Sequence, residues 1–254
     1  MSTRFATFER FQEAVRAYAG DPSASNLLMA NEGSVAVYYS PFEWVNPRAK
    51  VVLVGITPGR VQAANALAEA KRCLLAGLPP AEILSKAKQT GAFSGAMRPN
   101  LINLMDAIGL AKWLGIGSCA DLFASKGELL QTASALQFPV FVDGDNYNGS
   151  PDPSKSPLLR SMLVEHFGGM ARSLPDAVYI PLGPVPTKAL AWLVREGHIP
   201  AGRILEGLPH PSGANAERIA YFLGRKPKAE LSAKTDATKL DAARARLTDA
   251  VKLL

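Results

Sequence analysis

The sequence predicts an α/β fold in which a parallel sheet is covered by helices on both faces. Short runs of apolar residues at 50–54, 177–182 and 203–205 are typical of strands that are buried on both sides. Segments with helical spacing of apolar residues separate these runs, and strands that alternate with helices form parallel sheets. With 254 residues, 48% of them hydrophobic, the chain is long enough to bury one sizeable core.

The first half of the chain contains a strand at 34–39, before the buried run at 50–54. Phe8, Phe11 and Val15 recur at helical spacing, and Gly20 marks the end of that first helix. The same patterns predict further helices at about 60–76, about 80–88 and 98–110.

In the second half, residues 129–142 mix strand and irregular signals, and residues 143–157 are rich in turn-forming residues. That segment is either an ordinary exposed connection or, given its length, a functional loop. Further helices are predicted at 158–167, 186–196 and about 215–223.

We divide the chain into a main domain, 1–224, which begins with a helical extension, and a basic, Ala-rich helical tail, 225–254. The tail holds eight Lys and Arg residues against four Asp and Glu residues, and therefore +4 of the net charge of +6. Leu240, Ala243 and Leu247 would form the apolar side of its helix. The tail either packs on the domain as a solvated helix or acts as a basic arm on phosphates.

Composition narrows the function classes. A pI of about 9.4 is compatible with a polyanionic partner. Cys73 and Cys119 form no C-x-x-C pattern and the chain has three His, so we expect no metal site, no iron–sulfur cluster and no other cofactor. The amino terminus has no signal-peptide pattern, and no stretch of eighteen apolar residues occurs. We therefore expect a cytoplasmic protein with no membrane partner; its oligomeric state is left open.

Two unusual segments follow predicted strands. In open parallel sheets, ligands bind beyond the carboxyl ends of the strands. Residues 55–59 (GITPG) follow the first buried strand, and residues 209–213 (PHPSG) follow the last. Each combines glycine, which permits close backbone approach, with proline, which fixes the chain path, and each leads into a helix whose amino terminus favours an anion.

Four segments, taken in order, resemble the uracil-DNA glycosylase superfamily over about residues 45–224. Residues 51–59 (VVLVGITPG) are similar to its first motif, a strand followed by G-x-N-P-G or G-x-x-P-G, and residues 210–213 (HPSG) to its second. Residues 92–110 resemble the intervening segment, in which a phenylalanine precedes a helix, and residues 178–190 resemble the third strand and its helix.

This resemblance implies a three-layer α/β/α sandwich with a central four-stranded parallel sheet. It also implies an enzyme that flips a damaged base, such as uracil, out of DNA and hydrolyses its bond to the sugar. Such chemistry needs a stacking platform, a donor to the departing base anion and a group that positions water.

By resemblance, Phe93 is the stacking platform, His210 is the donor to the base, and Ser212 binds a backbone phosphate. The resemblance places the other substrate-binding residues in the two motif loops: Gly55, Ile56, Pro58, Gly59 and Arg60 in the first, and Pro211 and Gly213 in the second.

Thr57 departs from the family pattern, because it stands where active relatives carry Asn or Asp. We retain it as a catalytic candidate beside His210, and Asp143, Asp145 and Asn148 are the nearest residues that could compensate. The family also reads uracil with an Asn, which should fall near residues 131–137, where this chain has none.

Three functions remain open: a glycosylase for uracil or another damaged base, a non-catalytic binder of a base, nucleotide or nucleic acid, and a hydrolase of a small nucleoside-like substrate. Phe93 also fits a core position, His210 a loop cap and Thr57 a structural turn residue. We expect the two motif loops to meet across one cleft.

Overall fold

The computed structural model describes residues 5–91 and 97–254 of the chain, except for the burial of Gly91. The chain divides into two compact units that are interleaved in sequence. Unit 1 consists of Met1–Val45, Gly55–Ala92 and Ala133–Ala171, and unit 2 of Asn46–Val54, Phe93–Thr132 and Arg172–Leu254. The tail after Gly224 lies in unit 2, and the domain boundary expected there stays a prediction.

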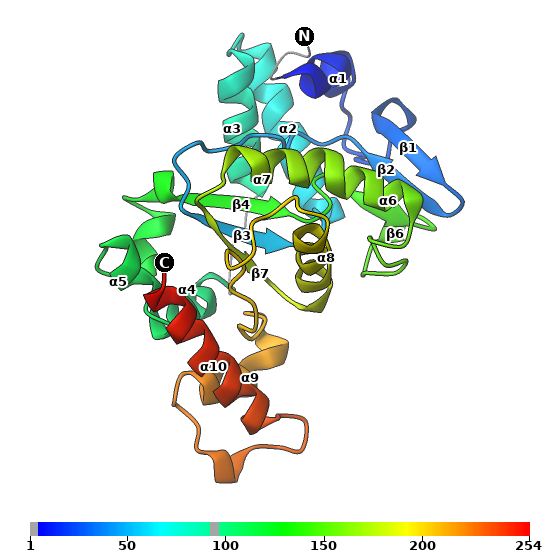
Figure 1. Ribbon diagram of the computed structural model, residues 1–254. Coiled ribbons are helices and arrows are strands. Elements are labelled where there is room, and N and C mark those ends of the chain that lie inside the picture. Colours follow the sequence, from blue (N-terminus) through cyan, green and yellow to red (C-terminus); the bar gives the residue numbers. More distant parts are fainter. Residues whose placement is uncertain (1–4, 92–96) are drawn as a thin grey trace. The chain divides into compact units, whose positions relative to one another are not determined.

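A three-stranded parallel sheet confirms the α/β class (Figure 1). Its order is β4 (Leu130–Ser134), β3 (Val51–Gly55) and β7 (Val178–Pro181). Val51 lies opposite Val178 and Leu53 opposite Ile180, and all four of these side chains are buried. The strand predicted at 50–54 is therefore interior, as its continuous apolar run indicates.

The segment at 203–205 lies beside β7, but it does not form a fourth regular strand. Ile204 makes a single parallel bridge to Tyr179, whose N–H donates to the carbonyl of Arg203 at 2.8 Å. Pairing ends early because Gly207 turns the chain with a φ of +113° and Pro209 has no N–H to donate. The described sheet thus has three strands and a bridge, and not the four strands that were expected.

A second, antiparallel sheet belongs to unit 1: its strand at 35–38 confirms the strand predicted at 34–39, but its pairing into a sheet was not predicted. Its order is β1 (Leu28–Glu32), β2 (Val35–Tyr38), β5 (Val140–Val142) and β6 (Asp145–Asn146). The sequence Asp143-Gly144 makes the turn between β5 and β6, with φ values of 51° and 83°. Two central residues with positive φ match the right-handed twist of a hairpin, so the expected loop at 143–157 begins as a strand pair.

The helices of unit 1 include those predicted at about 60–76, about 80–88 and 158–167, with slightly different bounds. They are α1 (Ala6–Arg16), α2 (Arg60–Leu75), α3 (Pro80–Gly91), α6 (Pro157–Met162) and α7 (Gly169–Ser173), with a π-helical segment (Leu163–Gly168) between the last two. Aromatic side chains fill this unit: Phe11 stacks on Tyr39 with ring centroids 4.7 Å apart, and Tyr39 in turn contacts Phe138.

The helices of unit 2 pack against the strands of the parallel sheet or against one another. They are α4 (Met97–Ala107), α5 (Leu110–Leu114), α8 (Pro184–Arg195), α9 (Ala216–Phe222) and α10 (Ala237–Lys252). The single helix predicted at 98–110 is divided because Gly109 adopts a left-handed conformation, with a φ of +84°. Short 3₁₀ turns occur at Ser25–Leu27, Cys119–Phe123, Gly127–Leu129, Gly213–Asn215 and Lys228–Glu230.

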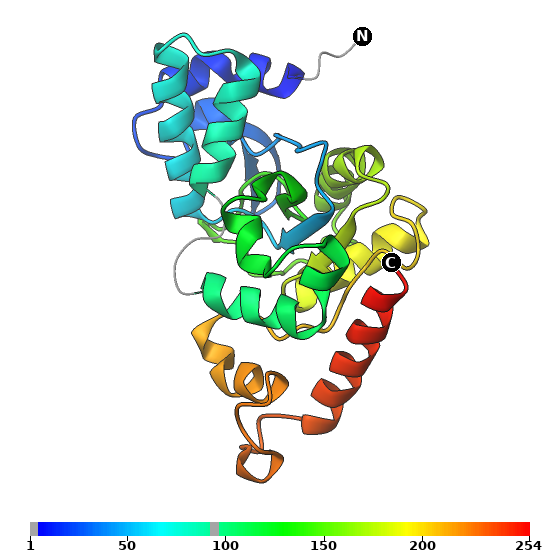
Figure 2. The same ribbon diagram turned by 90° about the vertical axis from the view of Figure 1, so that its left-hand side faces the viewer.

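The tail helix α10 is part of the core of unit 2. Leu247 and Val251 are buried in the same cluster as Leu53, Ile180 and Leu205 of the sheet region. Figure 2 shows α10, in red, near α9, and the two helices are in contact. The tail therefore packs on its own unit, as one of the two sequence interpretations expected.

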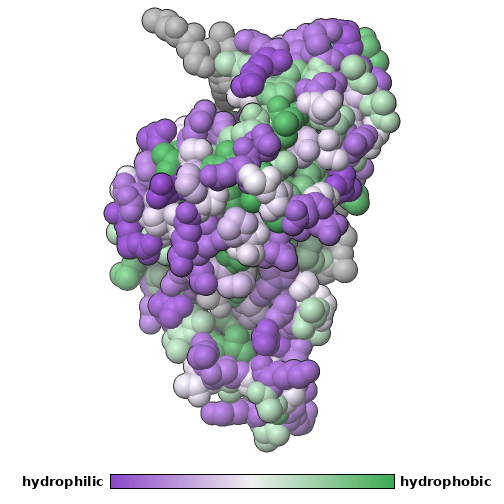
Figure 3. Space-filling model, turned by 90° about the vertical axis from the view of Figure 1, so that its right-hand side faces the viewer, coloured by the Kyte–Doolittle hydropathy of each residue, from purple (hydrophilic) through white to green (hydrophobic). Residues whose placement is uncertain are grey.

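The surface seen in Figure 3 is mostly hydrophilic, and its hydrophobic residues form small, separate patches. Large hydrophobic side chains are exposed at four described positions: Leu28, Val61, Leu75 and Leu253. Within the described ranges, no helix combines the length and the apolar character needed to cross a bilayer.

Candidate functional site

The first motif loop follows β3 and is bonded to its own unit. The hydroxyl of Thr57 donates to the carbonyl of Phe138 at 2.9 Å and accepts from the N–H of Val140 at 3.2 Å. One side chain thus joins the loop to the segment that enters β5. This arrangement is typical of a structural turn residue, which was one of the two interpretations of Thr57.

The amino terminus of α2, which begins at the end of this loop, is capped by protein side chains. Oε1 of Gln62 accepts from the N–H of Gly59 at 3.0 Å, and Oδ1 of Asn146 accepts from the N–H of Arg60 at 2.8 Å. Two of the N–H groups that would favour an anion at a helix start are therefore satisfied from within the chain.

Arg60, predicted to line a base pocket, anchors the β5–β6 hairpin. Its guanidinium lies over the ring of Phe141, 4.4 Å from the centroid, and Nη2 donates to the carbonyl of Gly144 at 2.7 Å. Nη1 donates to Oγ of Ser23 at 3.0 Å. The side chain thus holds three segments of unit 1 together.

Phe93, the predicted stacking platform, lies outside the described residues. Of the residues considered as replacements for a catalytic Asn or Asp, Asp143 is in the hairpin turn and Asp145 is in β6. Asn148 accepts from the N–H of Ser150. Asn146, whose amide contacts the start of α2, was not predicted from the sequence. It comes close to α2 only because β5 and β6 form a hairpin.

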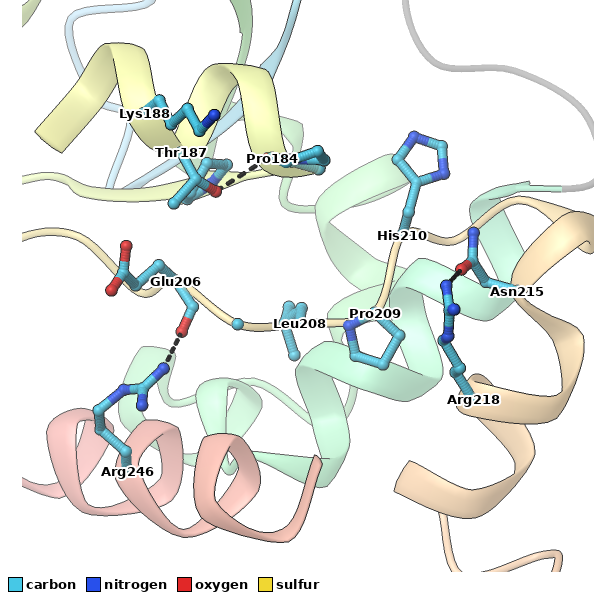
Figure 4. Close-up of a pocket in the computed structure, with 13 residues that line it drawn as sticks. Pro184, Thr187, Lys188, Glu206, Leu208, Pro209, His210, Asn215, Arg218 and Arg246 are labelled. Atoms are coloured by element: carbon cyan, nitrogen blue, oxygen red, sulfur yellow. Dashed lines mark hydrogen bonds between the residues drawn. The ribbon is translucent and has the colours of Figure 1, made fainter. Parts of the chain in front are cut away.

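The second motif loop lines a cavity in unit 2. The cavity has a volume of about 490 Å³, and His210 and Pro209 form part of its wall (Figure 4). Its full lining is Pro181, Gly183, Pro184, Thr187, Lys188, Glu206, Gly207, Leu208, Pro209, His210, Asn215, Arg218 and Arg246. The size falls within the range of small-molecule sites.

Hydrogen bonds within the loop fix the tautomer of His210. Its Nδ1 accepts from the N–H of Ser212 at 3.3 Å, so the proton of a neutral imidazole lies on Nε2. Burial lowers the pKa of His210 below its ordinary value and therefore favours this neutral form. The residue can thus act as a neutral hydrogen-bond donor through Nε2.

The loop around His210 is held from several sides. Nδ2 of Asn100, on α4, donates to the carbonyl of Pro211 at 2.9 Å, and Nδ2 of Asn215 donates to Oγ of Ser212 at 3.2 Å. The ring packs against Gly183, where an added Cβ would lie 3.5 Å from Cδ2 of His210. A donor held in this way needs little rearrangement before it acts.

The structure brings the predicted site residues into two groups. Gly55 to Arg60 belong to unit 1, and His210 to Gly213 belong to unit 2. The expectation that the two loops meet across one cleft stays a prediction. The basic cavity residues Lys188, Arg218 and Arg246 were not predicted, because they come from three helices that tertiary packing brings together.

No group of three or more His, Cys, Asp and Glu side chains is placed to hold a metal ion among residues 5–91 and 97–254. Cys73 and Cys119 are both buried and carry free thiols.

Comparison with known proteins gives one clear relationship. No protein-family model and no solved structure matches the chain significantly. The uncharacterized protein YoxB of Bacillus subtilis (strain 168) is 34% identical over 241 residues, which cover 92% of this chain and 94% of YoxB. The chain belongs to the YoxB family. The match extends through most of both units.

Proposed function

We propose that this YoxB-family protein binds a nucleic-acid base in the manner of the uracil-DNA glycosylases and uses His210 as the donor to that base. The observation that carries the proposal is the neutral Nε2–H donor of His210, held on a rigid loop at the edge of a cavity. A departing base gains negative charge only as its bond to the sugar breaks, so a fixed donor lowers that barrier selectively.

The order of the elements supports the same proposal. The two motif loops follow β3 and the segment 203–205, which pair with β7 from either side in one parallel arrangement. Ligands of open parallel sheets bind beyond the carboxyl ends of such strands. We propose that the fold is the three-layer sandwich of this superfamily, with residues 203–205 as a reduced fourth strand and DNA as the partner.

A second candidate is a binding protein of the same type without glycosylase activity, and the contacts of Thr57 favour it. The hydroxyl is already engaged with the backbone of Phe138 and Val140. A threonine in that state is poorly suited to activate water, and the carboxylate or amide of active relatives has no replacement at this position.

One assay distinguishes the two candidate functions. The protein is incubated with DNA strands that carry a single uracil, hypoxanthine or xanthine, and alkali followed by a sizing gel reveals abasic sites. If wild type cleaves, His210→Ala should reduce the rate about 100- to 1,000-fold with little change in binding, because the donor acts in the transition state.

His198→Ala is the matched control, because His198 belongs to the same unit and does not line the cavity. Its cleavage rate should equal that of wild type. The non-catalytic candidate is favoured if wild type cleaves no strand but binds a strand that carries one of these bases, and if His210→Ala weakens that binding. A protein that does neither contradicts both.

A further inference from the structure

The cavity beside His210 carries an excess of positive charge. Lys188 on α8, Arg218 on α9 and Arg246 on α10 line it, against one carboxylate, that of Glu206. In Figure 4 the three cations are seen around the chain that runs from Glu206 to His210, on different helices. The ligand for which this cavity is suited is therefore an anion.

These cations are not neutralised by the protein. In the part of the chain that the structure describes, no carboxylate lies within 4 Å of the charged nitrogens of Lys188, Arg218 or Arg246. Arg246 donates instead to the carbonyl of Glu206 at 3.2 Å, and Arg218 to Oδ1 of Asn215 at 2.7 Å. Each guanidinium has five N–H donors, so these bonds orient the group without using all of them.

Arg246 is held in place although it lies in the carboxyl-terminal tail. Its neighbours Ala243 and Leu247 are buried. Gly207 lets the helix approach closely: an added Cβ would lie 3.0 Å from Nη2 of Arg246 and 3.1 Å from Cβ of Ala243. The wall that α10 adds to the cavity is thus a fixed part of the unit.

We infer that this cavity binds phosphate groups of a nucleic-acid strand, through Lys188, Arg218 and Arg246. This inference rests on the proposed function, because His210 lines the same cavity. Arginine and lysine are the usual phosphate partners. The three cations lie on three different helices around the cavity. Cations distributed in this way suit successive phosphates of a strand better than one compact phosphate.

The test measures binding of a fluorescein-labelled single strand of DNA without any damaged base, by anisotropy over a range of salt concentrations. Lys188→Ala, Arg218→Ala and Arg246→Ala should each weaken binding about tenfold, because each removes a charged hydrogen bond. Each should also reduce the slope of log K against log salt by about 0.7, the change expected when the protein neutralises one phosphate fewer on a single strand.

Arg244→Ala is the matched control, since Arg244 lies on the exposed part of the same helix and does not line the cavity. It should leave affinity and salt slope unchanged. Thermal unfolding monitored by circular dichroism checks that the variants are folded. Cavity variants that bind like Arg244→Ala would overturn the inference.

Competition by dUMP and by inorganic phosphate distinguishes the sources of the phosphate. A strand site requires the strand to bind at least tenfold more tightly than dUMP; equal affinity would overturn the assignment to a strand. Glycosylase activity is measured on the damaged strands and phosphate binding on the undamaged strand, so failure of the proposed function and failure of this inference give different results.

Discussion

The two motif loops look alike in sequence but differ in what their polar groups contact. In the loop Gly55–Gly59, the Thr57 hydroxyl and the Gly59 N–H bond to the protein itself. In the loop Pro209–Gly213, His210 keeps one ring nitrogen as a donor at the wall of a cavity. A glycine- and proline-framed turn can therefore have its polar groups bonded within the protein in one place and facing a cavity in another.

The two units that contain these loops also differ in how far their charged side chains are exposed to solvent. Unit 1 contains a buried polar cluster: Tyr39 donates to Glu43 at 2.8 Å, and Nζ of Lys88 donates to the carbonyls of Phe42 and Trp44 at 3.0 and 2.6 Å. Burial raises the pKa of Glu43 to about 7 and lowers the pKa of Lys88 to about 7. The cations of the cavity in unit 2 are instead exposed.

The largest expected effect is a loss of stability in unit 1 as the pH rises. Glu43 has its pKa raised from 4.5 to about 7 by folding, so the stability it contributes is full below pH 4.5 and is lost between pH 4.5 and 7. The loss is on the order of 3 kcal/mol, because one pKa unit corresponds to about 1.4 kcal/mol. Folding lowers the pKa of Lys88 from 10.5 to about 7, so Lys88 destabilises the folded state below pH 7, and this penalty is relieved as the pH rises from 7 to 10.5.

Urea unfolding at pH 4.5 and 7.5 measures this effect. Glu43→Gln keeps the acceptor for Tyr39 and should be more stable than wild type at pH 7.5 but not at pH 4.5. Glu230→Gln, at an exposed glutamate, is the control and should follow wild type. Equal behaviour of the two variants would show that Glu43 does not set the pH dependence.

The next effect tests whether the first motif loop is structural. Thr57→Val removes the hydroxyl that joins Phe138 and Val140, and the free energy of unfolding should fall by about 1–3 kcal/mol because two main-chain groups lose a partner. Thr57→Ser retains the hydroxyl and should lose less. A valine variant as stable as wild type, measured by urea unfolding, would remove the contrast between the loops.

The smallest effect concerns the cap of α2. Asn146→Ala removes the acceptor for the N–H of Arg60 and should lower the free energy of unfolding by about 1 kcal/mol. Asn146→Asp keeps an acceptor and adds negative charge at the amino terminus of the helix, so it should stay within about 0.5 kcal/mol of wild type. If the aspartate variant is as unstable as the alanine variant, Asn146 does not act as a cap.

Much of the fold could be predicted from the sequence because its signals are local. Continuous apolar runs identified β3 and β7, and helical spacing identified α2 and α8. The antiparallel sheet was missed because its strands are short and partly polar: β6 has two residues, Asp145 and Asn146. The run at 203–205 was identified, but its pairing stops after one bridge, and no local pattern reports where pairing ends.

The candidate site was less accessible to sequence reasoning. His210 could be identified because it lies between two prolines, where a histidine side chain contributes little to core packing. Lys188, Arg218 and Arg246 are ordinary surface cations when viewed one at a time, on helices separated by long stretches of chain. Their common cavity results from packing of α10 on Gly207, which a pattern over a few residues cannot reveal.

The packing of α10 against Gly207 determines how this protein can be shortened or recombined with its relatives. A chain cut after Gly224 would leave Leu205 and its neighbours without the cover of Leu247 and Val251, and would lose Arg246 as well. The last two residues differ, because Leu254 packs partly against this core whereas Leu253 is 87% exposed. Exchanges between YoxB relatives should therefore transfer the segments around Gly207 and Arg246 as a pair.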